Sequence, residues 1–325
     1  MYLNEKRIEF RPLKNGRTPL VHRPRIFVFL LACAAVVSFV CLRQTKSQSG
    51  LRRITNTTEE GININPSLSG DGRILAFEST EDVAGAGGTD HFRGIRANIS
   101  VDPPTFFQMG GTRAVAPAIS QDGSRIAFAS KDDPLGTNHD GNSEIFLFNG
   151  SNLLQIMNTS PGDPANRVIN GNFQPSISDD GRFIAFASNR DLASQNGDGN
   201  LEIFIYDSIA STFTQLTNSS ATVGFSDAKI SGDGSTIACI RDNGATASTN
   251  RDLIKITRTT AAQLALATNV QKLAMTYGRA ISDDGARVAY SGETATNSSQ
   301  VFFYDGRSGN VNRQVTSLGT RSTEV

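Results

Sequence analysis

The sequence is poor in the residues that carry most catalytic and redox chemistry. It contains three cysteines and three histidines in 325 residues. Cys33 and Cys41 fall in an apolar segment near the N-terminus, so Cys239 is the one cysteine beyond it. These numbers exclude a framework of disulfides. A lone cysteine in a strand acts as a small hydrophobic residue, and we expect this of Cys239.

Sequence motifs of several enzyme classes are also missing. The chain has no Gly-x-Ser-x-Gly nucleophile elbow. Only His91 and His139 follow the apolar segment, too few for a histidine-based metal centre or a multi-histidine lyase site. Phosphate loops, dinucleotide fingerprints and Cys-x-x-Cys pairs are absent. We therefore expect a protein that is not an enzyme and that needs no cofactor.

The formal net charge is zero, but the charges are unevenly distributed. Residues 1–25 hold seven basic residues and two acidic ones, a net charge of +5. The remaining chain has 24 basic and 29 acidic residues and thus a net charge of −5. Nucleic-acid binding requires a basic surface, so we expect no nucleic-acid partner for the folded part.

The basic tail precedes an apolar run at residues 26–42, in which only Ser38 is not clearly apolar. Seventeen residues span roughly 25 Å as a helix, at the short end of what crosses a bilayer. A basic segment followed by an apolar one is typical of secretory signals and of anchors with a cytoplasmic N-terminus. We expect export, by a cleaved signal peptide or a transmembrane anchor at 26–42, followed by a linker at 43–50. The folded part would then lie in the periplasm or outside the cell.

A short motif, Ser-x-Asp-Gly followed by an apolar segment, occurs five times after residue 50. Its aspartates are Asp71, Asp122, Asp180, Asp233 and Asp284, at intervals of 51 to 58 residues. Asp-Gly between apolar runs is a strong hairpin signal, because glycine adopts positive φ without strain. Repeats of this length indicate blades of a propeller. Residues 51–325 are therefore predicted to be an all-β propeller of four-stranded blades, preceded by one hydrophobic helix.

Each repeat can be divided into four strands, A to D. Strand A ends at the serine of the motif and strand B follows the glycine. Strand C is clearest at 144–149, 202–207 and 300–305, and strand D at 155–158, 215–218 and 314–317. Alanines at matching places in strand B suit close packing between blades. A further copy of strand D at 53–56 precedes the first strand A, so five units and one leading strand are visible. We favour an incomplete six-bladed pattern over a closed five-bladed or an open ring.

The third repeat, at 172–218, carries the most complete set of motifs: Pro-Ser-x-Ser, Asp-Gly-x-x-Ile-Ala-Phe, Asp-Gly-Asn-x-Glu-Ile-Phe and Gln-Leu-Thr-Asn. This repeat resembles that of the TolB-type β-propellers, and the resemblance covers roughly residues 51–325. The resemblance implies a propeller of the cell envelope, or a secreted one, that binds partners. The same repeat forms the non-catalytic domain of some serine peptidases, so fold is better specified than function.

The most polar segments are two loops between strands B and C, at 131–144 and 189–202. Oxygen-bearing side chains alternate in both, at Asn138, Asp140, Asn142 and Glu144 and again at Asn196, Asp198, Asn200 and Glu202. The alternation resembles part of a calcium loop, although the full ligand spacing is not met. The simpler interpretation, which we favour, is a turn set by Asp-Gly-Asn with the glutamate paired at the strand edge. Calcium is the alternative.

Three arginines, Arg190, Arg241 and Arg251, are candidates for a binding rim beside these loops and could take a carboxylate or a glycan. Exposed loop charge is the simpler interpretation. We predict a non-enzymatic scaffold of the cell envelope that binds a protein or glycan partner through its rim loops. The alternatives are the propeller domain of a serine-peptidase-like hydrolase, whose catalytic part would lie after residue 325, and a propeller lyase or glycan-active enzyme.

Overall fold

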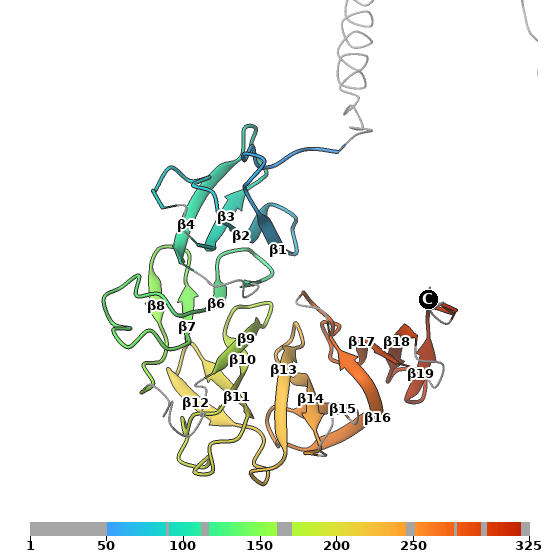
Figure 1. Cartoon of the computed structure of the whole chain (residues 1–325). Helices are drawn as coiled ribbons and strands as arrows, with labels where there is room; N and C mark the ends of the chain where they lie inside the picture. Colours follow the sequence, from blue (N-terminus) through green and yellow to red (C-terminus); the bar gives the residue numbers. More distant parts are fainter. Residues whose placement is uncertain are drawn as a thin grey trace, which may run out of the picture. The chain divides into compact units, whose positions relative to one another are not determined.

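A computed structural model describes residues 51–88, 91–111, 117–160, 171–244, 251–275, 278–293 and 298–319 (Figure 1). The chain divides into two units, Met1–Arg53 and Ile54–Val325, and everything below concerns the second. Its described residues contain 19 strands and no helix, so none of them forms a membrane-spanning helix. The apolar run at 26–42 lies outside the described residues, and the all-β prediction is confirmed for the rest.

The first three blades are separate four-stranded antiparallel sheets, with strands paired in chain order. Blade 1 comprises β1 (Asn63–Leu68), β2 (Ile74–Ser79), β3 (Arg93–Asn98) and β4 (Thr105–Gly111). Blade 2 comprises β5 (Ala118–Ile119), β6 (Ile126–Ser130), β7 (Glu144–Phe148) and β8 (Leu153–Gln155). Blade 3 comprises β9 (Asn172–Ile177), β10 (Phe183–Ser188), β11 (Glu202–Asp207) and β12 (Thr212–Gln215).

The last two blades form one continuous seven-stranded sheet. Its strands are β13 (Gly224–Ile230), β14 (Thr236–Asp242), β15 (Arg251–Thr257), β16 (Gln263–Ala274), β17 (Arg287–Glu293), β18 (Ser299–Asp305) and β19 (Val311–Gln314). The 12-residue β16 is the outer strand of blade 4, and its end also pairs with β17 of blade 5. The strand A expected at the fifth motif is reduced to a single bridge between Ile281 and Val288.

The segments predicted as strand D lie just after the strands that the structure forms there. In blade 3, β12 ends at Gln215, and the Thr217 hydroxyl then accepts the hydrogen bond of the Ile203 amide at 2.8 Å. A side chain thus replaces the carbonyl that a longer strand would supply. The leading copy at 53–56 is not a strand, so that part of the prediction is wrong.

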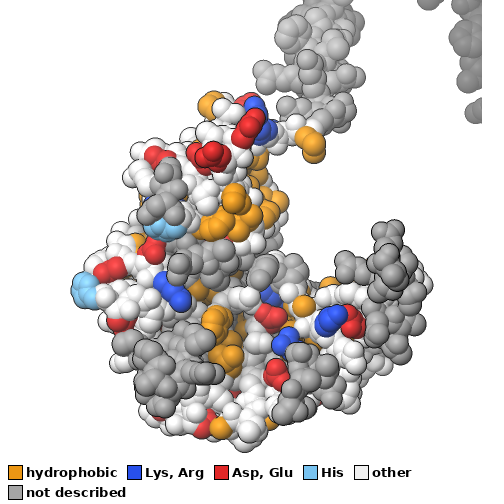
Figure 2. Space-filling view, viewed as in Figure 1, with side chains coloured by type: hydrophobic (Ala, Val, Ile, Leu, Met, Phe, Trp, Pro, Cys, Tyr) orange, Lys and Arg blue, Asp and Glu red, His pale blue; other side chains and the backbone are white. Residues whose placement is uncertain are grey.

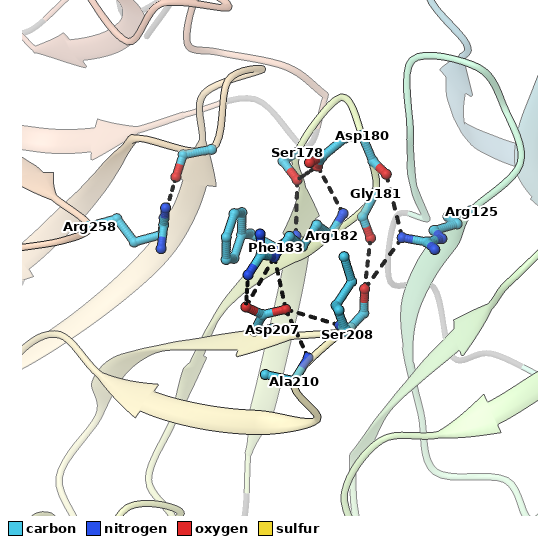
Figure 3. Close-up of polar contacts among 12 residues, drawn as sticks. Arg125, Ser178, Asp180, Gly181, Arg182, Phe183, Asp207, Ser208, Ala210 and Arg258 are labelled. Carbon is cyan, nitrogen blue, oxygen red and sulfur yellow. Dashed lines mark hydrogen bonds and ion pairs between the residues drawn. The ribbon is translucent and has the colours of Figure 1, made fainter.

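The five Ser-x-Asp-Gly motifs form the hairpins between strands A and B, as predicted. In blade 3, Gly181 has a φ of 69° and its amide donates to the carbonyl of Ser178 at 2.9 Å. The Asp180 carboxylate accepts from the Ser178 hydroxyl at 2.6 Å and from the Arg182 amide at 2.9 Å (Figure 3). The Ser178 hydroxyl in turn accepts from the Phe183 amide at 3.0 Å. The motif is therefore a turn-forming device, which explains its repetition.

Apolar clusters fill the four spaces between consecutive blades. The strand-B alanines face the next blade and are 0% exposed at Ala76, Ala127, Ala185 and Ala238. The neighbouring larger side chain of the same strand faces the preceding blade, as Phe186 does between blades 2 and 3. The small residues thus allow the sheets to approach closely, as predicted.

Main-chain hydrogen bonds also join the blades near their inner strands. The residue after the motif serine links each blade to the next: the Gly70 amide bonds Gln121, the Gln121 amide bonds Asp179 and the Asp179 amide bonds Gly232, at 2.8–2.9 Å. The Asp233 amide continues the series to Asp283 at 2.8 Å. This inter-blade ladder sets the position of each inner strand.

Candidate functional site

The inner strands of all five blades line one cavity of about 320 Å³. Its wall is formed by the last residues of β1, β5, β9 and β13 and by the segment before the fifth hairpin. Two cationic side chains, Lys229 and Arg279, contribute to the wall, together with serines, prolines and isoleucines. Among the described residues that line it, none is acidic. The cavity therefore has a mixed polar and apolar lining that includes two cationic side chains.

Arg279 connects blades 5 and 3. Its guanidinium donates to Asp283 of the fifth hairpin at 2.6 Å and to Asp179 of the third, 100 residues earlier in the chain. Gly232 lies between these two acids: a Cβ there would come within 2.3 Å of the Asp179 Oδ2 and 3.0 Å of the Asp283 Cα. Glycine at 232 thus makes room for the bridge.

Lys229 is 3% exposed and lies on β13. Burial lowers the pKa of its ammonium group, and the charge of Asp227 partly opposes this effect. Burial likewise raises the pKa of Asp227. The buried Lys229 thus faces the cavity from an inner strand that also carries the half-buried Asp227.

The two polar loops between strands B and C have the same internal hydrogen bonds. In the loop at 131–144, Asp133 Oδ1 accepts from the amides of Thr137 and Asn138 at 2.5 and 2.8 Å. In the loop at 189–202, Asp191 Oδ1 accepts from the amides of Gln195 and Asn196 at 2.7 and 2.9 Å. The side chains thus define one loop conformation that two blades share.

The calcium candidates of these loops fall into two groups. Asp140 and Asp198 are exposed, whereas Asn138, Asn142, Glu144, Asn196 and Glu202 are buried and Asn200 is half-buried.

Each of the two glutamates begins strand C, and its Oε1 accepts the amide and the hydroxyl of a residue after strand D. That residue is Thr159 for Glu144, at 2.6 and 2.7 Å, and Ser219 for Glu202, at 2.6 Å. Burial raises the pKa of Glu144 to about 6. The described residues contain no cluster of three or more His, Cys, Asp or Glu suited to a metal.

The three candidate rim arginines are engaged by their own surroundings. Arg190 donates to the carbonyl of Ser160 at 2.6 Å. Arg241 pairs with Asp252 at 2.6 Å, and Arg251 lies 3.7 Å from Asp242.

Histidine and cysteine chemistry is equally constrained in the described residues. His91 pairs with Asp132 at 2.5 Å and His139 with Asp133 at 3.1 Å, both on loops. Cys239 is fully buried and free, and burial raises the pKa of its thiol. This thiol is therefore unreactive, and Cys239 is the small core residue that we expected.

The two cationic residues of the cavity were missed by the sequence analysis, although a signal existed. Three of the five strand-A copies have proline three residues before the motif serine, and the fifth has Arg279 there. At the next position the other copies have serine or alanine, and the fourth has Lys229. Departures from the repeat thus mark the functional candidates.

The sheets, their order and the shared inner cavity define the class of the protein: it is a β-propeller. No family model and no curated protein matches the sequence. The fold is similar to that of TolB from Acinetobacter baumannii, with a TM-score of 0.54 and 16% identity over 85% of this chain and 59% of that one. The chain thus spans about three fifths of that TolB.

Propeller domains of peptidases are similar to the same degree. The propeller domain of the Trilobed protease from Pyrococcus furiosus has a TM-score of 0.50 and 13% identity, over 78% of this chain and 71% of that one. A puromycin-hydrolyzing peptidase of Mycobacterium tuberculosis has a TM-score of 0.52 and 13% identity, over 79% of this chain and 37% of that one. The TolB-like propeller expected from the repeats is confirmed as a fold.

Proposed function

We propose that the protein is a non-enzymatic propeller scaffold that binds a partner through its rim loops. The observation that carries the proposal is a groove of about 400 Å³ between the loop at 131–144 and the outer strand β8. Leu135 of the loop and Leu154 of β8 are both 43% exposed in it, and Ile156 and Met157 complete the wall. An aliphatic groove beside an outer strand favours a protein partner over a glycan.

The loop that forms this groove is held firmly. Thr137 hydrogen-bonds the Gln155 side chain of β8, and the Asp133 carboxylate fixes the turn. A preformed groove binds with little loss of conformational entropy. The B–C loops follow the ends of strands B, whereas the cavity adjoins the hairpins at the beginning of those strands. The groove and the cavity are thus separate candidate surfaces.

Site-specific crosslinking of the full-length protein in intact cells tests the rim. A photoreactive residue at Leu135 should capture a specific protein partner. The same residue at Ile209, which is 69% exposed in the turn between β11 and β12, serves as the control. Capture at Ile209 alone would show that the binding surface lies at the hairpin end and not on the rim loops. Capture of glycan alone at Leu135 would refute a protein partner.

Localisation in the cell envelope is part of the proposal. It rests on the basic tail at 1–25 and the apolar run at 26–42. Alkaline extraction of membranes and N-terminal sequencing separate an anchor from a cleaved signal. Recovery of the intact chain in the cytosol would refute export.

A second candidate is the non-catalytic propeller of a peptidase, which the similarity to the two peptidase structures favours. It predicts association with a serine hydrolase. An active-site-directed fluorophosphonate probe should then label a polypeptide that copurifies with the chain, and the absence of labelling would refute it.

We further infer that the fold is built for a sixth blade. The strand-B alanine of blade 5, Ala289, is exposed, and Val301 beside it is 42% exposed, whereas the matching faces of blades 1–4 are covered. On blade 1, Leu68 is 54% exposed, and hydrophobic side chains gather on this blade in Figure 2. A further sheet would cover both faces.

A further inference from the structure

One position of strand C carries three residue types in the last four blades, although the register is the same. The residues are Glu144, Glu202, Asp252 and Gln300, and each pairs with the last or next-to-last residue of strand B. Each side chain accepts a backbone amide, from the segment after strand D in blades 2, 3 and 5 and from within the outer strand β16 in blade 4. The blades of this chain thus allow a carboxylate and an amide to be compared at one structural position.

In blades 4 and 5 the polar atoms of this side chain all have hydrogen-bond partners, and the charge of Asp252 is paired with a cation. Asp252 of blade 4 accepts from the Arg241 guanidinium at 2.6 Å and the Asn243 amide at 3.0 Å, as well as from the Asn269 backbone at 2.9 Å. Gln300 of blade 5 accepts through Oε1, and its Nε2 donates to Ser298 at 2.8 Å. Holding the end of strand D therefore does not require a negative charge.

In blades 2 and 3 the charge is present without such compensation. Glu202 is 0% exposed, and its Oε2 has no hydrogen-bond donor among the described residues. Glu144 is also 0% exposed; its Oε2 has a 3.4 Å contact with the Asn172 amide, and the side-chain amide of Asn142 also hydrogen-bonds this carboxylate. Neither glutamate forms an ion pair within the described chain. A buried carboxylate without a counter-charge is unfavourable, so a cation is expected nearby.

The same loops contain further buried oxygens without donors. The Oδ1 atoms of Asn138, Asn142, Asn196 and Asn200 are all buried and unpaired within the described residues. Their orientation is fixed, because each Nδ2 faces carbonyl oxygens; that of Asn196, for example, donates to the Asn200 carbonyl at 3.0 Å. Exchanging the nitrogen and oxygen of an amide would place its oxygen against a backbone carbonyl oxygen. Each of the two loops therefore keeps two buried asparagine oxygens without a donor.

We propose that each of these loops binds a calcium ion, through Asn196, Asn200 and Glu202 in blade 3 and through Asn138, Asn142 and Glu144 in blade 2. Amide and carboxylate oxygens are the ligands that calcium prefers, and water completes its coordination shell of six to eight oxygens. The pairs of asparagines are adjacent in each loop, since the Asn138 Nδ2 bonds the Asn142 carbonyl at 3.0 Å.

Arg190 does not replace the ion in blade 2. The charge of its guanidinium interacts with those of Glu144 and Asp140, but its Nη2 donates to the Ser160 carbonyl at 2.6 Å and not to either carboxylate.

The test uses the full-length protein in detergent, first treated with EDTA and then freed of it. Titration with CaCl₂ should raise the Tm saturably, by about 7 °C per site at a hundredfold excess over Kd. Calorimetry should count two sites. NaCl at the same ionic strength should not reproduce the rise. The decisive variant is the double substitution Glu144→Gln and Glu202→Gln, which copies the Gln300 arrangement and should fold yet lose the calcium response.

The double substitution Glu59→Gln and Glu60→Gln, which removes two exposed acids outside both loops, controls for the change in net charge and should retain the full response. A wild-type Tm that calcium leaves unchanged would overturn the proposal, as would an equal rise with NaCl. A calcium response that persists in the double variant would refute these ligands. Partner binding is measured separately by crosslinking, so failure of either result leaves the other interpretable.

Discussion

The contrast between covered and uncovered alanine faces gives the sharpest test of the fold. Ala185 is 0% exposed and packs between blades 3 and 4, whereas Ala289 occupies the matching place in blade 5 and is exposed. Replacing Ala185 by leucine adds three carbons to a filled space. Such overpacking costs about 1–3 kcal/mol. For a chain of this size the Tm should fall by roughly 3–8 °C.

Ala289→Leu adds the same atoms at the same strand position, so differences in strand propensity cancel. A surface substitution changes stability by less than about 0.5 kcal/mol. The Tm of this variant should therefore stay within about 2 °C of the wild type. Thermal unfolding followed by circular dichroism measures both. Equal losses in the two variants would show that another sheet covers blade 5 in solution, and the reasoning from exposure would fail.

Two further predictions concern the hairpin end. Gly232→Ala should lower the free energy of unfolding, measured in urea, by about 1–3 kcal/mol, since its Cβ would clash with Asp179. Gly197→Ala, whose Cβ would have no atom within 4 Å, should leave the stability unchanged. Equal losses in the two variants would contradict this reasoning. Hydrogen bonds from Arg182 lower the pKa of Asp207 to about 2, so the wild type should lose stability as pH falls from about 4 to 2. Because Arg182 is 41% exposed, we expect only about 1 kcal/mol; Asp207→Asn should lack this loss, and an unchanged acid limb would refute the pairing.

The repeat made the fold predictable, because each Asp-Gly hairpin is a local signal. Asp180 bonds residues only two positions away on either side, so its role can be read from five consecutive residues. The alanine positions of strand B were predictable for a related reason, since neighbouring blades repeat the same pattern. The fifth strand A could not be predicted this way, because β16 extends into its place and pairs with β17.

The candidate sites were harder to predict because their partners are distant in sequence. The bridge from Arg279 to Asp179 spans 100 residues and depends on the missing side chain of Gly232. The arginines expected on the rim are bound to nearby groups, as Arg241 is to Asp252. Alternation in the two loops pointed to oxygen ligands, but only the structure distinguishes the satisfied amide nitrogens from the unpaired oxygens.

The seven-stranded sheet has a mechanical consequence. Blades 1, 2 and 3 are joined to their neighbours by loops, side-chain packing and single bonds of the inter-blade ladder. Blades 4 and 5 share β16, so separating them requires breaking strand pairing within one sheet. Under tension, or in amide hydrogen exchange, residues 224–314 should open as one cooperative unit, whereas the earlier blades can detach singly. The chain is thus a rigid double blade carrying three separable ones.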